Sequence, residues 1–225
     1  LILKAPLPQN LILEIQQAWL DISESGKSFA VRSSATAEDL PDASFAGQQE
    51  TFLNINGFDN LIDAVRNVYA SLFTDRAISY RRLRNFKGSL SISVGVQEMV
   101  RSDIGASGVA FTLDTESGYR GSIFITSSYG LGEGIVQGTV NPDEFYVFKE
   151  ALEKNNFPII KKSLGEKAKK MIFADNNLPG KSVKFVKVPK KEANQFSLSN
   201  SEIIELAKYA KTIEDHYKVP MDIEW

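Results

Sequence analysis

Two carboxylates stand at alternate positions near the end of the sequence, Asp222 and Glu224. In a strand, residues two apart project from the same face, about 6.6 Å apart along it. Met221, Ile223 and Trp225 would then cover the opposite face. Neighbouring carboxylates repel unless a cation or a proton lies between them, and hard oxygen ligands suit a Mg²⁺ ion that also contacts phosphate. The pair predicts a metal site, and its alternative is the solvent face of an edge strand.

An arginine stands at the start of a long polar segment whose composition is typical of a functional loop. The Arg32 guanidinium offers a fork of N–H donors to phosphate and cannot lose its charge. Further along, Gly47 allows a close backbone approach and Thr51 supplies a hydroxyl. These residues predict a phosphate site. The alternative is a surface ion pair between Arg32 and Glu38 or Asp39.

The stretch Gln97-Glu98-Met99-Val100 follows an apolar run with the alternation of a strand. Backbone groups at a strand end can hydrogen-bond the edge of an adenine ring, while Met99 could pack on the face of the ring. Gln97, Glu98 and Val100 are therefore predicted to contact a nucleotide base. For Met99, the alternative is an ordinary core position.

Three other motifs are interpreted as structural. Gly26-Lys27-Ser28 matches the end of a P-loop, but Asp21 stands where its first glycine belongs, so we expect a turn. The glycines of Gly130–Gly134 depart from the dinucleotide fingerprint and lack a strand-to-helix context, which predicts close backbone packing or a mobile lid. His216, the single histidine, lies beside Asp215 near a helix end and is expected on the surface.

The composition excludes several classes of function. The chain has 225 residues, 26 Lys plus Arg, 28 Asp plus Glu and a net charge of −2, so no bulk field recruits nucleic acid or an anionic membrane. The absence of cysteine removes disulfides, thiol nucleophiles and cysteine-ligated metals. No apolar run is long enough to cross a bilayer, and the first residues do not resemble a signal peptide, so we expect a cytoplasmic protein.

Helices and short strands alternate along the chain and must position these groups. Apolar residues recur at helical spacing before position 21, over 58–72 and over 203–213, and the last of these helices opens with a capping box from Ser199 to Glu202. The polar segment 32–47 is predicted to be neither helix nor strand. An α+β or α/β fold is expected. The remaining predictions are an arginine-rich helix over 76–84, strands over 29–31, 90–96, 108–112, 122–126, 144–148 and at the C-terminus, and a solvated lysine-rich hairpin or loop over 161–191.

Five segments together resemble the nucleotide-binding domain of the phosphoenolpyruvate synthase family, the pyruvate, water dikinases. They are Phe29–Thr51, Val94–Val109, Ser128–Glu133, Asn141–Phe145 and Met221–Trp225, and the resemblance extends over nearly the whole chain. It implies an α+β ATP-grasp fold in which two α+β lobes enclose a nucleotide cleft. It also implies that residues 1–225 are a partial domain of a larger chain, without its lysine-bearing N-terminal start and its downstream phosphohistidine and pyruvate domains.

The resemblance implies ATP and Mg²⁺ as cofactors. The implied reaction transfers the β-phosphoryl of ATP to a histidine on a swivelling domain, releases AMP and phosphate, and then makes phosphoenolpyruvate from pyruvate, a reaction of gluconeogenesis. We expect the fragment alone to bind nucleotide weakly and not to turn over. The implied roles are phosphate binding and catalysis by Arg32, a phosphate loop with Gly47 and Thr51, adenine contacts by Gln97, Glu98 and Val100, and metal binding by Asp222 and Glu224.

Two other functions compete with this one. A related dikinase, such as a rifamycin phosphotransferase, uses the same kind of ATP domain with another acceptor. A non-catalytic nucleotide-binding module would keep the fold without phosphorylating a histidine. The expected partners are ATP and the other domains of the full-length protein; no nucleic acid or membrane is expected, and a homo-oligomer is left open.

Overall fold

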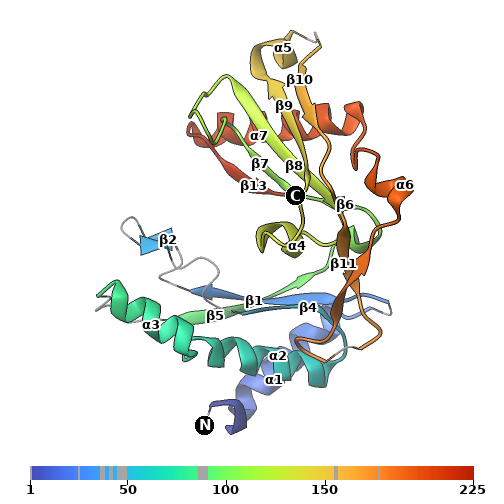
Figure 1. Cartoon of the computed structure of the whole chain (residues 1–225). Helices are drawn as coiled ribbons and strands as arrows, with labels where there is room; N and C mark the ends of the chain where they lie inside the picture. The colour runs from blue at the N-terminus through green and yellow to red at the C-terminus, as the bar shows by residue number, and fades with distance from the viewer. Residues whose placement is uncertain are drawn as a thin grey trace. The chain divides into compact units, whose positions relative to one another are not determined.

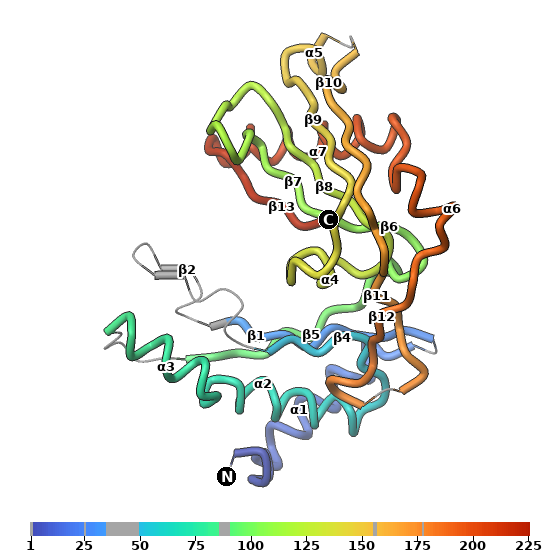
Figure 2. The backbone as a smooth tube through the Cα atoms, viewed as in Figure 1, coloured from blue at the N-terminus to red at the C-terminus, as the bar shows by residue number. Residues whose placement is uncertain are grey.

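The computed structural model describes residues 2–24, 26–35, 39–40, 43–44, 50–85, 91–154, 157–176 and 178–225. The chain forms two compact units, each with helices and antiparallel strands of its own (Figures 1 and 2). Unit 1 comprises Leu1–Val100 and Phe173–Val183, and unit 2 comprises Arg101–Ile172 and Lys184–Trp225. This mixture of elements confirms the predicted α+β class.

Unit 1 is built on a three-stranded antiparallel sheet in the order β4-β1-β5. In Figures 1 and 2, α1 and α2 lie along one face of this sheet. A separate ladder pairs β2 with β3. The elements are η1 (Ile2–Lys4), α1 (Gln9–Ile22), β1 (Phe29–Ala35), β2 (Asp39–Leu40), β3 (Ala43–Ser44), β4 (Thr51–Ile55), α2 (Phe58–Ser71), α3 (Asp75–Leu83) and β5 (Ile92–Glu98).

The core of unit 1 lies between α2 and one face of the sheet. The apolar spacing of α2 places Leu61 and Val68 on the same side, where they are buried against Val31 of β1 and Ile55 of β4. Their burial follows the hydrophobic pattern that predicted this helix. The opposite face of the sheet takes no part in this core.

Unit 2 contains a larger sheet in the order β10-β9-β8-β7-β13, with β6 also paired to β8. Strands β11 and β12 pair with each other. The chain passes from unit 2 into unit 1 at the end of β11 and returns to unit 2 at the start of β12, because Phe173–Val183 belongs to unit 1. Its elements are η2 (Ser102–Ile104), β6 (Ala106–Ser107), β7 (Val109–Phe111), β8 (Ser122–Tyr129), α4 (Glu133–Val136), β9 (Asp143–Phe148), α5 (Lys149–Glu153), β10 (Ile159–Ser163), β11 (Lys169–Phe173), β12 (Val183–Lys187), α6 (Lys190–Ala193), α7 (Asn200–Tyr217) and β13 (Asp222–Glu224).

Helix α7 covers one face of the larger sheet. Its predicted capping box is present, because the Ser199 hydroxyl accepts from the Glu202 amide and the Glu202 carboxylate accepts from the Ser199 amide. Ile203 and Ala207 on its apolar stripe are buried against Phe145 and other residues of the sheet. Neither α7 nor any other helix in the described ranges is long and apolar enough to span a bilayer.

A buried ion pair lies at the start of β9. The side chains of Lys167 and Asp143 are both fully buried and contact one another. The Asp143 carboxylate also accepts from the Gly165 amide at 2.8 Å and from the Ser197 amide and hydroxyl at 2.8 and 2.7 Å. Lys167 Nζ donates in addition to the Gly165 carbonyl at 3.1 Å. The prediction of a solvated lysine-rich stretch is therefore wrong at Lys167.

Two further predictions about local structure need correction. The segment 32–47 is predicted to be neither helix nor strand, but β1 continues to Ala35, and β2 and β3 also lie within it. Arg32 is paired with both β4 and β5, and residues 33–35 are paired with β5, so long-range pairing outweighs a weak local pattern. The segment Gly130–Gly134 does join a strand, β8, to a short helix, α4. The close packing predicted there is confirmed, since a Cβ on Gly130 would lie 2.5 Å from the Met171 carbonyl oxygen.

Candidate functional site

Three predicted nucleotide contacts lie on one face of the unit 1 sheet. Arg32 on β1 is paired with Thr51 on β4, and Gln97 on β5 is paired with Ala30, two residues from Arg32. Directly paired residues in an antiparallel sheet project to the same side, so Arg32, Thr51 and Gln97 share a face. Their side chains are exposed, whereas the alternate residue Val31 is buried on the α2 side. The fold brings these three residues to the face that the core leaves open.

The Arg32 side chain lies across a glycine on the neighbouring strand. Gly95 is its register partner on β5, and a Cβ on Gly95 would lie 3.6 Å from Arg32 Cγ. Within the described residues Arg32 forms no ion pair. The alternative partners are Glu38 and Asp39. Glu38, the side chain of Asp39 and the predicted phosphate-loop residue Gly47 all lie outside what the structure describes. Sequence reasoning missed Gly95, although a glycine inside an alternating strand is a known signal of close approach.

The end of β5 lies at the edge of the unit 1 sheet as formed by the described residues. The Met99 amide donates to the Ser28 carbonyl at 2.8 Å, so it is already used within the fold. Successive residues of an antiparallel strand direct their N–H and C=O groups to opposite sides. Glu98 therefore directs its backbone away from β1, and among the described strands β5 is one of the two edges of the order β4-β1-β5. The side chain of Val100, just beyond the strand, is 80% exposed.

The Glu98 carboxylate itself is engaged elsewhere. It forms an ion pair with the Lys27 ammonium at 3.1 Å, and Glu24 forms a second ion pair with the same ammonium at 3.2 Å. Hydrogen bonding to Glu98, then to Glu24, raises the pKa of Lys27. Gly26 beside it has φ +88° and sits in the predicted turn. Glu98 is therefore suited to contact a base through its backbone, and Lys27 takes part in a local surface ion pair.

The two C-terminal carboxylates share one face of β13 in unit 2. Asp222 and Glu224 are exposed, whereas Ile223 between them packs against the core under α7. This is the predicted alternation. Among the residues that the structure describes, no group of three His, Cys, Asp or Glu side chains could hold a metal ion. A Mg²⁺ ion commonly takes one or two carboxylates and completes its shell with phosphate oxygens and water, so the pair fits this ion.

The register of the larger sheet adds an aromatic row and a third carboxylate to that face. Asp222 is paired with Phe111, which is followed across the sheet by Phe124 and Tyr146. The rings of Phe124 and Tyr146 lie 4.8 Å apart. In the neighbouring row, Glu144 lies three strands from Glu224, about 14 Å at the usual strand spacing. That separation is too large for both carboxylates to bind one cation directly.

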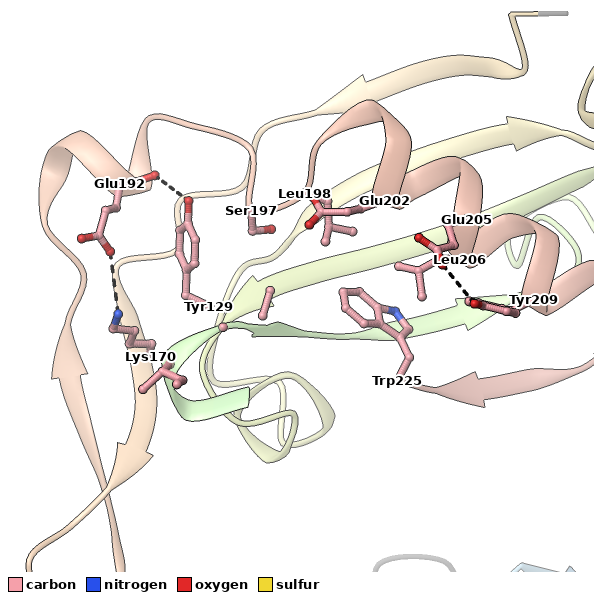
Figure 3. A pocket seen from close by; sticks show the side chains of 13 residues that line it. Tyr129, Lys170, Glu192, Ser197, Leu198, Glu202, Glu205, Leu206, Tyr209 and Trp225 are labelled. Carbon is pink, nitrogen blue, oxygen red and sulfur yellow. Dashed lines mark hydrogen bonds and ion pairs between the residues drawn. The ribbon is translucent and has the colours of Figure 1, made fainter. Parts of the chain in front are cut away.

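A pocket of about 620 Å³ lies elsewhere in unit 2, on the α7 side of the sheet (Figure 3). Its acidic groups are engaged: Glu205 accepts from the Tyr209 hydroxyl, Glu202 closes the capping box, and Glu192 pairs with Lys170. None of the predicted site residues lines it. The lining residues are Ile104, Gly105, Ala106, Tyr129, Lys170, Glu192, Ser197, Leu198, Glu202, Glu205, Leu206, Tyr209 and Trp225.

Comparison with known proteins identifies the family to which the chain is similar. The family described as pyruvate phosphate dikinase, AMP/ATP-binding domain, matches residues 1–225. The chain belongs to this family. Domains of this family have the ATP-grasp type of α+β fold, which agrees with the elements described above. The family match also agrees with the resemblance found in the sequence.

Several similar proteins carry the same name. Phosphoenolpyruvate synthase of Neisseria meningitidis serogroup B is 60% identical over 229 residues, which cover 100% of this chain and 29% of that protein. The Escherichia coli K12 protein of that name is 53% identical over 227 residues, with the same two coverages. The Pyrococcus furiosus protein is 42% identical over 234 residues, covering 100% of this chain and 28% of its own length. The chain thus spans less than a third of the length of these relatives.

Proposed function

We propose that this chain binds Mg·ATP for a phosphoenolpyruvate synthase, the full-length protein of which it forms the nucleotide-binding part. The observation that carries the proposal is the shared, core-free sheet face with Arg32, Thr51 and Gln97, in a chain that matches an AMP/ATP-binding family over residues 1–225. The names of the similar proteins favour pyruvate over a rifamycin as the final acceptor.

Different residues of unit 1 bind different parts of the nucleotide. Arg32 binds phosphate through its guanidinium fork, and the Thr51 hydroxyl beside it donates to the same group. Gln97, the Glu98 backbone and the Val100 backbone contact the adenine edge, where the end of β5 directs backbone polar groups away from β1. Gly47 belongs to the loop over the phosphates. Because Arg32 keeps its charge, it neutralises phosphate at every working pH.

In unit 2, Asp222 and Glu224 would hold a Mg²⁺ ion. When bound, Mg²⁺ neutralises charge on the phosphate oxygens during transfer. Asp222 and Glu224 would each supply a carboxylate oxygen as a ligand, both from the same face of β13. Phosphoryl transfer needs positioning and charge neutralisation more than a protein nucleophile, which fits this set of groups.

The proposed reaction is completed by other parts of the full-length protein. The β-phosphoryl of ATP passes to a histidine nitrogen on a swivelling domain, its bond to the AMP oxygen breaks, and water takes the γ-phosphoryl as inorganic phosphate. The phosphohistidine then donates its phosphoryl to the enol oxygen of pyruvate. Arg32 acts in the first half by binding the phosphoryl groups as negative charge shifts among them.

Binding by the isolated chain tests the nucleotide site. Titration calorimetry with ATP and Mg²⁺ is expected to show about 10- to 100-fold weaker binding for Arg32→Ala, because a hydrogen-bonded charge contact is lost. Arg76→Ala is the matched control, since it removes an exposed arginine on α3 of the same unit. Equal affinities for the two variants would refute the role of Arg32.

The metal pair is tested by the dependence of binding on Mg²⁺. Asp222→Asn and Glu224→Gln are expected to raise the Mg²⁺ concentration at which ATP binding strengthens, while ATP binding in EDTA stays unchanged. Glu166→Gln, which removes an exposed carboxylate in the same unit, is the control. In the full-length protein, labelled ATP should form phosphohistidine in the wild type and not in Arg32→Ala or Glu224→Ala. Labelling at the wild-type level in both variants would refute the proposed reaction.

A further inference from the structure

The strand that carries the two C-terminal carboxylates is short. Strand β13 has three residues and is paired only with β7 within the described sheet. Side chains alternate between faces, so a slip of one residue would bring Ile223 to the face where Asp222 and Glu224 lie. Three paired residues at a sheet edge form few ladder hydrogen bonds. Contacts beyond the ladder therefore add to the accuracy with which this strand is positioned.

A buried threonine extends the ladder at the end next to Asp222. Thr112, which directly follows β7, has an exposed fraction of 0%. Its hydroxyl oxygen accepts from the Met221 amide at 2.7 Å, and its own amide donates to the Met221 carbonyl at 3.0 Å. Met221 is the residue immediately before Asp222, so two hydrogen bonds fix the backbone at the start of β13.

The carbonyl of Thr112 is held by a second group of side chains. Lys149 Nζ donates to this carbonyl at 2.6 Å and to the Glu214 carboxylate of α7 at 2.7–2.8 Å. The Lys149 and Glu214 side chains are 10% and 16% exposed, so water competes weakly for these bonds. All three polar groups of Thr112 are thus satisfied, and they connect β13 to α5 and α7.

The far end of β13 is fixed by different means. Gly108 and Trp225 exchange two backbone hydrogen bonds, each 3.0 Å long. A Cβ on Gly108 would lie 1.9 Å from the Thr126 carbonyl oxygen and 2.8 Å from the Trp225 ring, so this end admits no side chain at Gly108. Thr112 makes the corresponding contact at the Asp222 end. Unlike Gly108, it can be replaced by a side chain of the same size or smaller, so its role can be tested without a steric clash.

We propose that Thr112 is a positioning residue for the metal-binding carboxylates, and that Lys149 and Glu214 hold it in place. Thr112 acts indirectly, by holding Met221, and through it Asp222, at a defined position along the edge of the sheet. This inference rests on the proposed function for the metal role of Asp222 and Glu224. The register itself is a property of the fold.

The test compares two substitutions at the same buried position. Thr112→Val keeps the shape but removes the acceptor for the Met221 amide, whereas Thr112→Ser keeps the hydroxyl. In hydrogen exchange followed by NMR, Thr112→Val should lose protection at the Met221 amide, and Thr112→Ser should retain it. Equal protection in the two variants would overturn the proposal. Thr212→Val, which removes a hydroxyl bonded within α7, controls for the general effect of the substitution.

The functional arm measures Mg²⁺ dependence. In the full-length protein and in the chain, Thr112→Val should need about 3- to 10-fold more Mg²⁺ for half-maximal tightening of ATP binding, the effect of one lost hydrogen bond. ATP binding in EDTA should not change, and Thr112→Ser should restore the wild-type requirement. A wild-type requirement in Thr112→Val would overturn the positioning role. Absence of any Mg²⁺ dependence in the wild type would instead overturn the proposed function.

Discussion

Removing either partner of the buried Lys167–Asp143 pair should destabilise unit 2 by different amounts. Lys167→Met removes the ammonium but leaves the Asp143 carboxylate with three donors from Gly165 and Ser197. We expect the free energy of unfolding to fall by about 3 kcal/mol, the lower end of the range for breaking a buried ion pair. Asp143→Leu leaves the ammonium with one carbonyl acceptor and two amides without an acceptor. We expect the free energy of unfolding to fall by about 5 kcal/mol, the upper end of the same range.

The two tryptophans allow the unfolding of unit 2 to be followed by itself. Trp19 lies in unit 1 and Trp225 in unit 2. In a Trp19→Phe background, fluorescence during urea unfolding reports on the surroundings of Trp225. The free energy of unfolding from linear extrapolation is then compared between Lys167→Met, Asp143→Leu and the parent chain.

An exposed ion pair in the same unit provides the control. Lys154 and Glu150 form an i, i+4 pair on α5 and the residue that follows it, and both side chains are 61% exposed. Lys154→Met should cost no more than about 0.5 kcal/mol, because water screens such pairs. If Lys154→Met and Lys167→Met cost the same, or if Asp143→Leu costs less than Lys167→Met, the reasoning from burial and donor count is wrong.

Two other predictions concern local stability. Hydrogen bonds from the Ser199 amide, then from its hydroxyl, lower the pKa of Glu202, so its contribution is complete above the ordinary glutamate pKa and is lost as pH falls through the lowered value. Glu202→Gln should therefore destabilise the chain at neutral pH and have little effect in acid, as urea unfolding across pH would show. Gly130→Ala should lower the melting temperature more than Gly138→Ala; both have positive φ, but only Gly130 faces a close contact, the Met171 carbonyl, so equal shifts would contradict this.

The sequence was sufficient where the deciding signals are local. Helix α2 follows from apolar spacing, and α7 from its spacing together with the Ser199 capping box, because neighbouring residues determine both features. The exposed position of His216 near the end of α7 also agrees with the prediction. Such elements need no knowledge of what they pack against.

Features set by pairing between distant segments were not predictable in the same way. The sequence predicts that Arg32 and Thr51 share a site, but nothing near Arg32 indicates that it pairs directly with Thr51 and Gly95, since this register follows from the sheet order β4-β1-β5. The burial of Lys167 was missed for a related reason. A lysine among many lysines favours a solvated position, and only the carboxylate of Asp143, 24 positions away in the sequence, makes its burial tolerable.

The C-terminal strand shows how local and long-range information combine. Alternation of Asp222, Ile223 and Glu224 predicts that the carboxylates share a face, but the same pattern would suit either face of a sheet. Pairing with β7 decides the face, because Ile223 then lies under α7 and both acids remain exposed. A slip of one residue would bury two carboxylates and expose an isoleucine, so the hydrophobic pattern already opposes it. Thr112 would then add accuracy of position rather than choice of face, which is why its loss should alter Mg²⁺ affinity while leaving the fold intact.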